Sequence, residues 1–167
     1  MGKTTTKDKA KARRALITEA ALTVIIRDGM SGLSSRAVAR EAGINSAMVH
    51  YAFDNMQALV RALLTRVVQG AAAVLDEVSV EGQSLSEAIE TLAHAFWQHV
   101  VDEPELARVQ YELTLHALSS GLPELAQAQY EGYLQITADK FGQTCSLSED
   151  SLQTLAGACV GMVDGIT

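Results

Sequence analysis

The stretch Leu33-Ser-Ser-Arg-Ala-Val-Ala-Arg-Glu-Ala-Gly-Ile-Asn-Ser-Ala-Met-Val-His-Tyr-Ala-Phe53 decides the fold of this 167-residue chain. It predicts two short helices joined by a turn at Gly43, the spacing of a helix-turn-helix whose second helix enters a DNA major groove. Ser34 suits the N-cap of the first helix, because its hydroxyl can accept a hydrogen bond from a free amide of the first turn. Gly43 suits the end of that helix, because glycine adopts a left-handed conformation without steric cost.

The second helix of this motif is expected to carry the residues that read DNA. Asn45 or Ser46 would cap it, and Val49 and Phe53 would anchor it in the core. Six residues then remain as candidates for the outward face: Asn45, Ser46, Ala47, Met48, His50 and Tyr51. An asparagine is suited to hydrogen bonding with adenine and a methionine to contact with a thymine methyl group.

The charge of the chain is divided unevenly between its two parts. The net charge is −7, which taken alone argues against nucleic-acid binding. Residues 1–66, however, hold eleven of the thirteen basic side chains and five acids, a net of +6, whereas residues 67–167 have a net of −13. A basic N-terminal part followed by an acidic part is expected where only the N-terminal part approaches DNA phosphates. The alternative is a solvated basic tail without a partner.

Four basic residues are predicted to neutralise DNA phosphates: Lys11, Arg13, Arg14 and Arg36. Such contacts would give DNA binding a steep dependence on salt, because each one releases condensed counterions. Together with Ser34 and the six outward-facing residues of the second helix, they form the predicted DNA-binding set.

The composition favours an all-α protein, because it is rich in aliphatic residues and alanine and contains only two prolines and 5% aromatic residues. The apolar runs are too short and too amphipathic to span a bilayer, and no secretory signal follows the first charged residues. We therefore expect a cytoplasmic protein without a membrane partner. Cys145 and Cys159 are far apart and lack metal-ligand spacing, which favours buried thiols over a disulfide.

The chain divides into three predicted parts. Residues 1–11 are expected to form a basic flexible arm, residues 12–54 a three-helix DNA-binding domain, and residues 55–167 a helical domain for ligand binding and dimerisation. Arg13 and Arg14 would open the first helix, and Asp28-Gly29 would end it. Three later helices are expected to begin at capping boxes, in which a polar N-cap pairs with a residue three positions on: Asp54 with Gln57, Ser84 with Glu87, and Ser146 with Glu149.

No constellation in the sequence predicts catalysis. His94, His99 and His116, with Glu90, are the only candidates for a metal site, and they match neither the HExxH nor the Glu-x-x-His pattern. No nucleophile motif and no phosphate-binding glycine loop is present. We predict that the protein is not an enzyme and uses neither metal nor cofactor.

Aromatic residues are concentrated in the second half of the chain, where amphipathic helices alternate with short breaks. For any single aromatic residue the ordinary interpretation is the hydrophobic core. Together they could line a cavity between helices, where small apolar molecules usually bind. The residues predicted to line it are His94, Trp97, Tyr111, Leu115 and Tyr130.

Residues 16–64 resemble the DNA-binding domain of the TetR (tetracycline-repressor-like) family of bacterial transcription regulators. The residues that carry the resemblance are Ser34, Val38-Ala39-Arg40-Glu41-Ala42-Gly43-Ile44, Val49-His50-Tyr51-Ala52-Phe53 and Met56-Gln57-Ala58-Leu59. The rest of the chain is similar only as a succession of helices. A helix-turn-helix in another kind of all-α protein is the alternative.

The resemblance implies a homodimeric repressor that a small molecule releases from a palindromic operator. Dimers of this family commonly form through the last two long helices, so the resemblance implies either a chain that is short for its family or a further helix beyond Thr167, and we expect the second. Two positions depart from the family pattern, because His50 stands where the family usually has a tyrosine and Met56 where it has a lysine. In the relatives this tyrosine and this lysine typically touch the DNA backbone. The second hypothesis is therefore a helical ligand-binding or protein-interaction module whose degenerate helix-turn-helix does not bind DNA.

Overall fold

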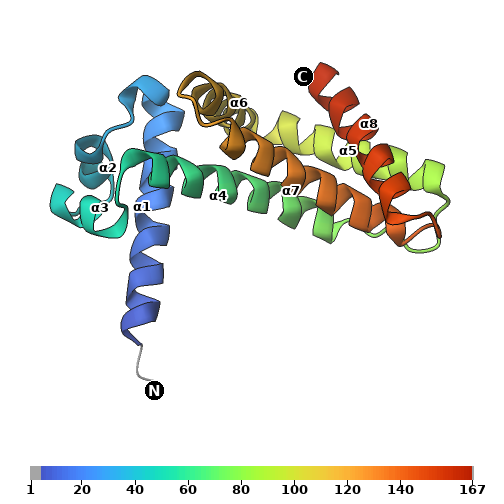
Figure 1. The fold of residues 1–167 in the computed structure, drawn as a ribbon, viewed down its shortest axis with the longest axis horizontal. Coiled ribbons are helices and arrows are strands. Elements are labelled where there is room, and N and C mark those ends of the chain that lie inside the picture. The colour runs from blue at the N-terminus through green and yellow to red at the C-terminus, as the bar shows by residue number, and fades with distance from the viewer. Residues whose placement is uncertain (1–4, 167) are drawn as a thin grey trace. The chain divides into compact units, whose positions relative to one another are not determined.

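The computed structural model describes residues 5–166, and the side chains of residues 5–162, and over this range it is all-α, as predicted (Figure 1). The described residues form eight α-helices and one 3-10 turn, and no strand is found among them. In chain order these elements are α1 (Thr6–Asp28), η1 (Met30–Gly32), α2 (Ser35–Glu41), α3 (Ser46–Ala52), α4 (Met56–Glu77), α5 (Leu85–Asp102), α6 (Pro104–Ser119), α7 (Pro123–Gly142) and α8 (Glu149–Ile166).

The helices group into two compact units. The first contains the chain up to Arg66 together with Glu105–Leu122, and the second contains Val67–Pro104 and the chain from Pro123 onward. The helix α4 contributes its first half to one unit and its second half to the other. The predicted division after residue 54 does not coincide with these units, because α6 joins the helix-turn-helix.

The helix α1 begins earlier than the sequence analysis predicted. Thr5 is its N-cap and forms a capping box with Asp8, in which each side chain bonds the backbone amide of the other residue. Hydrogen bonds from Thr5 hold the pKa of Asp8 below its usual value. The prediction of a flexible arm is therefore wrong for residues 6–11, and residues 1–4 of that arm lie outside the described residues.

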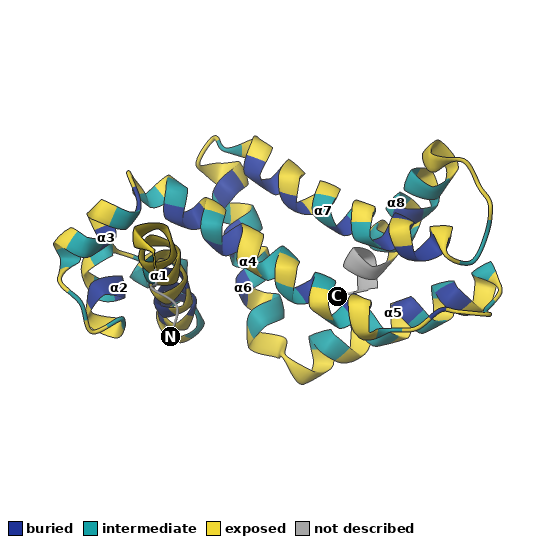
Figure 2. Ribbon diagram, turned by 90° about the horizontal axis from the view of Figure 1, so that it is seen from below, coloured by how far each residue is buried: buried dark blue, intermediate teal, exposed yellow. Residues whose placement is uncertain are grey.

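The core of the first unit lies where α1, α2, α3, α4 and α6 bring aliphatic side chains together. Its buried members include Ile17, Ala21, Val24, Ile25, Val38, Val49, Phe53, Leu59, Leu63, Val109, Leu113 and Ala117. Residues 5–12 are exposed, as the yellow near turns of α1 show in Figure 2, and Figure 1 shows these first turns extending beyond the other helices of the unit.

Two charged residues of α6 bind the end of α1 and the turn that follows. Arg108 donates through Nη2 to the carbonyl of Ile26 at 2.6 Å and also forms an ion pair with Glu112. Glu112 in turn accepts a hydrogen bond from the backbone amide of Met30 at 3.0 Å. These bonds satisfy backbone groups that a helix end leaves unpaired.

The second unit has its own core, formed by the end of α4, the loop after it, and α5, α7 and α8. Leu75, Val80, Ala88, Leu92, Ala138, Phe141 and Ala156 are buried there. Lys140 is only 8% exposed. Its Nζ donates to the carbonyls of Asp76 at 3.3 Å and Val78 at 3.1 Å, at the C-terminal end of α4.

Two of the three predicted capping boxes are wrong. Ser84 and Glu87 form the expected box at the start of α5. At the start of α4, however, Asn55 accepts the hydrogen bond, from the amide of Ala58, and Asp54 does not. Ser148, two residues after the predicted Ser146, accepts from the amide of Ser151 at the start of α8. In both cases the true cap lies closer to the first helical residue, as N-cap geometry requires.

By length and composition alone, α4 is long and apolar enough to cross a membrane, which the sequence analysis did not expect. A core helix of a soluble protein passes the same test. Leu59, Val60, Leu63 and Leu64, in the first half of α4, are buried, as apolar side chains of a core helix are.

Candidate DNA-binding surface

The helices α2 and α3 form the predicted helix-turn-helix, with each local signal at its expected position. Ser34 Oγ accepts from the amide of Ala37 at 3.2 Å and caps α2. Gly43 has φ +64°, the left-handed conformation expected of the turn, and no other residue type would adopt it without strain. Asn45, one of the two predicted candidates, caps α3 through a hydrogen bond from the amide of Ala47 at 2.9 Å.

Val49 and Phe53 anchor α3 as predicted, since both are buried at 2% exposure. The six predicted contact residues are arranged around the remaining surface of the helix. Asn45, Ala47, His50 and Tyr51 are exposed, whereas Ser46 and Met48 are half-buried. Tyr51 is the most exposed large hydrophobic side chain of this helix, at 77%, and the Arg13 guanidinium lies 5.6 Å from the centroid of its ring.

The side chain of Asn45 already has a partner within the protein. Its Oδ1 caps α3, which leaves the side-chain NH2 group free to donate. The bidentate pairing of an asparagine with adenine uses both the oxygen and the NH2 group. A contact from Asn45 to DNA would therefore use the NH2 group alone or share the oxygen with the cap.

The residues predicted to contact phosphates differ in whether their side chains are already bound to other groups of the protein. Arg36 and Lys11 are exposed, and Arg36 has no ion-pair or hydrogen-bond partner among the described residues. Arg14, in contrast, donates through Nη1 to the carbonyl of Ala52 and lies with Cζ 4.2 Å from the centroid of the Phe53 ring. The guanidinium of Arg14, although exposed, is thus already engaged by groups of the protein, in contrast to that of Arg36.

Ion pairs occupy two further arginines of the first unit. Arg27 bonds both Asp28 and Glu41, and these bonds raise the pKa of Arg27 and, through Arg27, lower that of Asp28. Arg66 pairs with Glu19 at 2.6 Å. The positive charge available to DNA therefore lies mainly on α2 and on the first turns of α1.

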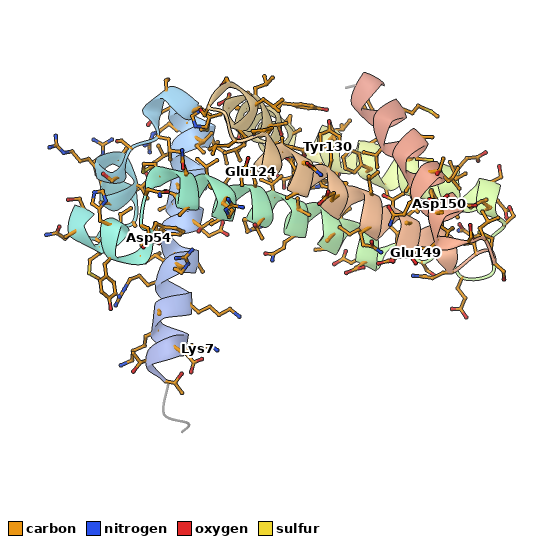
Figure 3. All side chains as sticks on the ribbon, viewed as in Figure 1. Lys7, Asp54, Glu124, Tyr130, Glu149 and Asp150 are labelled. Carbon is orange, nitrogen blue, oxygen red and sulfur yellow. The ribbon has the colours of Figure 1, made fainter. Side chains whose placement is uncertain are left out.

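The sequence analysis did not predict that the first turns of α1 are helical and carry basic side chains. Lys7, Lys9 and Lys11 are all exposed on its first turns, and Figure 3 labels Lys7 there. Lys7 and Lys11 share one helix face because they are four residues apart. The signal that could have revealed this helix is the Thr5-x-x-Asp8 spacing, which is the pattern of a capping box.

The residues predicted to line a ligand cavity fall in both compact units. His94 and Trp97 lie on α5, and Tyr130 lies on α7, where Figure 3 labels it; all three belong to the second unit. Tyr111 and Leu115 lie on α6, in the first unit. All five are exposed, Trp97 at 43% and Leu115 at 65%. The shared cavity stays a prediction.

The metal and cysteine predictions concern the second half of the chain. Within the part of the chain that the structure describes, no three His, Cys, Asp or Glu side chains are grouped to hold a metal ion. Cys145 and Cys159 are free, half-buried thiols, and burial raises the pKa of Cys159.

Part of the chain is similar to a known protein family and to a known protein. Residues 17–63 match the model of the family described as bacterial regulatory proteins, tetR family. A curated relative, the HTH-type nicotine-responsive transcriptional repressor HdnoR of Paenarthrobacter nicotinovorans, is 32% identical over 109 residues. That alignment covers 63% of this chain and 54% of the relative, so the chain matches about half the length of that protein.

Solved structures of similar fold cover more of the chain. The multidrug binding protein EbrR complexed with ethidium is 28% identical, with a TM-score of 0.72 over 92% of this chain and 84% of that chain. A member of the TetR family from Streptomyces coelicolor A3 is also 28% identical, with a TM-score of 0.71 and the same coverage. The likeness to these structures thus extends well beyond the helix-turn-helix.

Proposed function

We propose that the chain is a member of the tetR family of bacterial regulatory proteins, and that it is a cytoplasmic transcriptional repressor that binds a palindromic operator as a homodimer. In this proposal a small molecule binds better to a state in which the two copies of α3 no longer fit successive major grooves, about 34–36 Å apart. The effector shifts the population only through its different affinities for the two states. The proposal includes no enzymatic activity.

The observation that carries this proposal is the helix-turn-helix with its capped α3 and the basic side chains beside it. Asn45, Ala47, His50 and Tyr51 provide an exposed surface on α3, while Arg36 extends from the preceding helix without a partner among the described residues. A capped helix with exposed side chains beside a basic surface is the arrangement that major-groove binding requires.

Replacement of Arg36 by glutamine tests the proposed phosphate contact. Loss of one phosphate contact in each copy of the homodimer is expected to weaken binding to every duplex sequence alike and to reduce the slope of log K against log salt by about 1.8, about 0.9 for each contact. The measurement is fluorescence anisotropy of a labelled duplex over a series of salt concentrations. Arg27→Gln is the matched control, because Arg27 is paired with Asp28 and Glu41, and its loss should leave the slope unchanged. Equal slopes for wild type and Arg36→Gln would contradict the assignment.

The competing proposal, a module that has lost DNA binding, is favoured by His50 and Met56 at positions where the family contacts the backbone. The two proposals differ in binding to random duplex DNA at low salt. A repressor keeps nonspecific attraction to phosphates even away from its operator. An absence of binding under these conditions would favour the second proposal.

We further propose that the effector is not an anion. After Arg66 the chain contains only two basic residues, Arg108 and Lys140, against fifteen acidic ones. The structure uses both cations to bind backbone carbonyls at helix ends. An anionic ligand would find no arginine or lysine there without such a partner, whereas aromatic and acidic side chains suit a neutral or cationic molecule. The similar protein EbrR was solved in complex with ethidium, a cation, which supports the proposal of a neutral or cationic effector.

Direct binding of two planar dyes tests the charge preference. Ethidium is a cation and fluorescein an anion, and fluorescence anisotropy without DNA measures the affinity of each. We expect ethidium to bind at least about tenfold more tightly, a difference of about 1.4 kcal/mol. Salmon-sperm or other carrier DNA must be absent, because ethidium itself binds duplexes. Equal affinities, or tighter binding of fluorescein, would overturn this proposal and leave the proposed DNA binding untouched.

A further inference from the structure

We propose that Arg14 is a positioning residue that fixes the orientation of α3, so that it governs sequence recognition without touching DNA. The inference rests on the proposed function, because it concerns how α3 is presented to the groove. It also gives Arg14 a different role from Arg36, although both are exposed arginines of the same basic surface.

The length of α3 makes its orientation depend on contacts at its two ends. The helix has only seven residues. Isolated helices shorter than about 12–15 residues are marginal in water, so packing and capping must hold this one. At the N-terminal end Asn45 provides the cap from within the motif itself. At the C-terminal end the carbonyl of Ala52 accepts its side-chain hydrogen bond from Arg14, 38 residues earlier in the chain.

Arg14 makes two different contacts at this C-terminal end. Its guanidinium donates to the Ala52 carbonyl, and Cζ lies 4.2 Å from the centroid of the buried Phe53 ring. A planar guanidinium can stack on a ring while its N–H groups donate sideways, which a lysine ammonium cannot do. Its positive charge also complements the partial negative charge of the helix C-terminus. The side chain therefore ties α3 to the long helix α1.

The neighbouring contact supports the same link between α1 and α3. Arg13 lies 5.6 Å from the ring centroid of Tyr51, the residue just before Ala52. Two successive residues of α1 thus contact successive residues at the end of α3. A tilt of α3 would break the bond to Ala52 and displace all of the base-reading side chains together, whereas loss of a phosphate contact would leave them in place.

The experiment compares Arg14→Lys with Arg36→Lys in the full chain. Selection from a pool of random duplexes first provides the sequence that wild type binds best. Affinities for this duplex and for a scrambled duplex then give a specificity ratio for each variant. We expect Arg14→Lys to lower this ratio about tenfold, while its affinity for the scrambled duplex and the salt slope of that binding stay unchanged. Arg36→Lys keeps its charge at the surface and should retain the ratio.

A second variant tests the contact from its other side. Phe53→Leu removes the ring but keeps an apolar side chain, so it should lower the specificity ratio in the same way. In the double variant the two effects should be less than additive, because both remove one contact. Circular dichroism checks that each variant is folded at the temperature of the binding measurement.

The possible outcomes separate this inference from the proposed function. If Arg14→Lys retains the specificity ratio, or if it loses nonspecific affinity and salt slope as a phosphate contact would, the positioning role is overturned. Strict additivity of Arg14→Lys and Phe53→Leu would also overturn it. If wild type selects no sequence from the pool, the proposed function itself fails, and the positioning role fails with it.

Discussion

Replacement of Phe53 by alanine is expected to lower the free energy of unfolding by about 3–5 kcal/mol, because it opens a cavity at the base of the helix-turn-helix. Phe53 is 2% exposed and is among the largest fully buried side chains. The measurement is urea unfolding followed by circular dichroism. Loss of the ring also removes the surface on which Arg14 lies, so the ratio of specific to nonspecific DNA affinity should fall even where the protein is still folded.

The control for this prediction is Tyr51→Ala, two residues earlier. Tyr51 is 77% exposed, so its removal should change the free energy of unfolding by no more than about 0.5 kcal/mol. A loss below about 1 kcal/mol for Phe53→Ala would show that this ring is not part of a packed core.

A second large loss of stability is expected when Gly132 is replaced, because α7 passes close to α4 at this residue within the second unit. A Cβ atom built on Gly132 would lie 2.7 Å from Val68 Cγ1. Valine has a stiff, β-branched side chain, so the clash cannot be relieved by a simple rotation. We expect Gly132→Ala to destabilise the protein by about 1–3 kcal/mol, even though alanine is the better helix former.

Gly157→Ala provides a matched control with the opposite expected sign. Its Cβ would make an ordinary contact of 3.9 Å with Leu134 Cδ2. Without a clash, the gain in helix propensity should stabilise α8 by about 0.5–1 kcal/mol. The two variants are compared by thermal unfolding, and a Gly132→Ala protein as stable as Gly157→Ala would show that α7 and α4 do not approach closely at this point.

Local signals in the sequence predicted the elements that matter most for DNA recognition. The cap at Ser34, the left-handed Gly43 and the apolar anchors Val49 and Phe53 act over a few residues, so their spacing alone determines the motif. The same logic failed at Asp54 and Ser146, because several polar residues precede each helix and only packing decides which becomes the cap. The basic charge of residues 6–11 favours a flexible arm, and only the Thr5–Asp8 pair indicates that a helix begins there.

Contacts between residues far apart in the chain could not be predicted in this way. Arg14 was expected to bind phosphate from its charge alone, since nothing in the sequence places it against Ala52 and Phe53. The membership of α6 in the first unit likewise depends on buried residues such as Leu113 and on the bonds of Arg108 and Glu112 to α1 and η1. Such pairings are set by tertiary packing, which periodicity does not encode.

The burial of Lys140 gives the chain an unusual pattern of chemical reactivity. Four of its five lysines lie within the first eleven residues, at positions 3, 7, 9 and 11, and the fifth is held against two carbonyls with little access to solvent. Acylating reagents attack exposed, uncharged amines and would leave the Lys140 amine largely unlabelled. Amine labelling of the folded protein would therefore report on the N-terminal end of the chain, and protection of Lys7, Lys9 and Lys11 by duplex DNA would serve as a footprint.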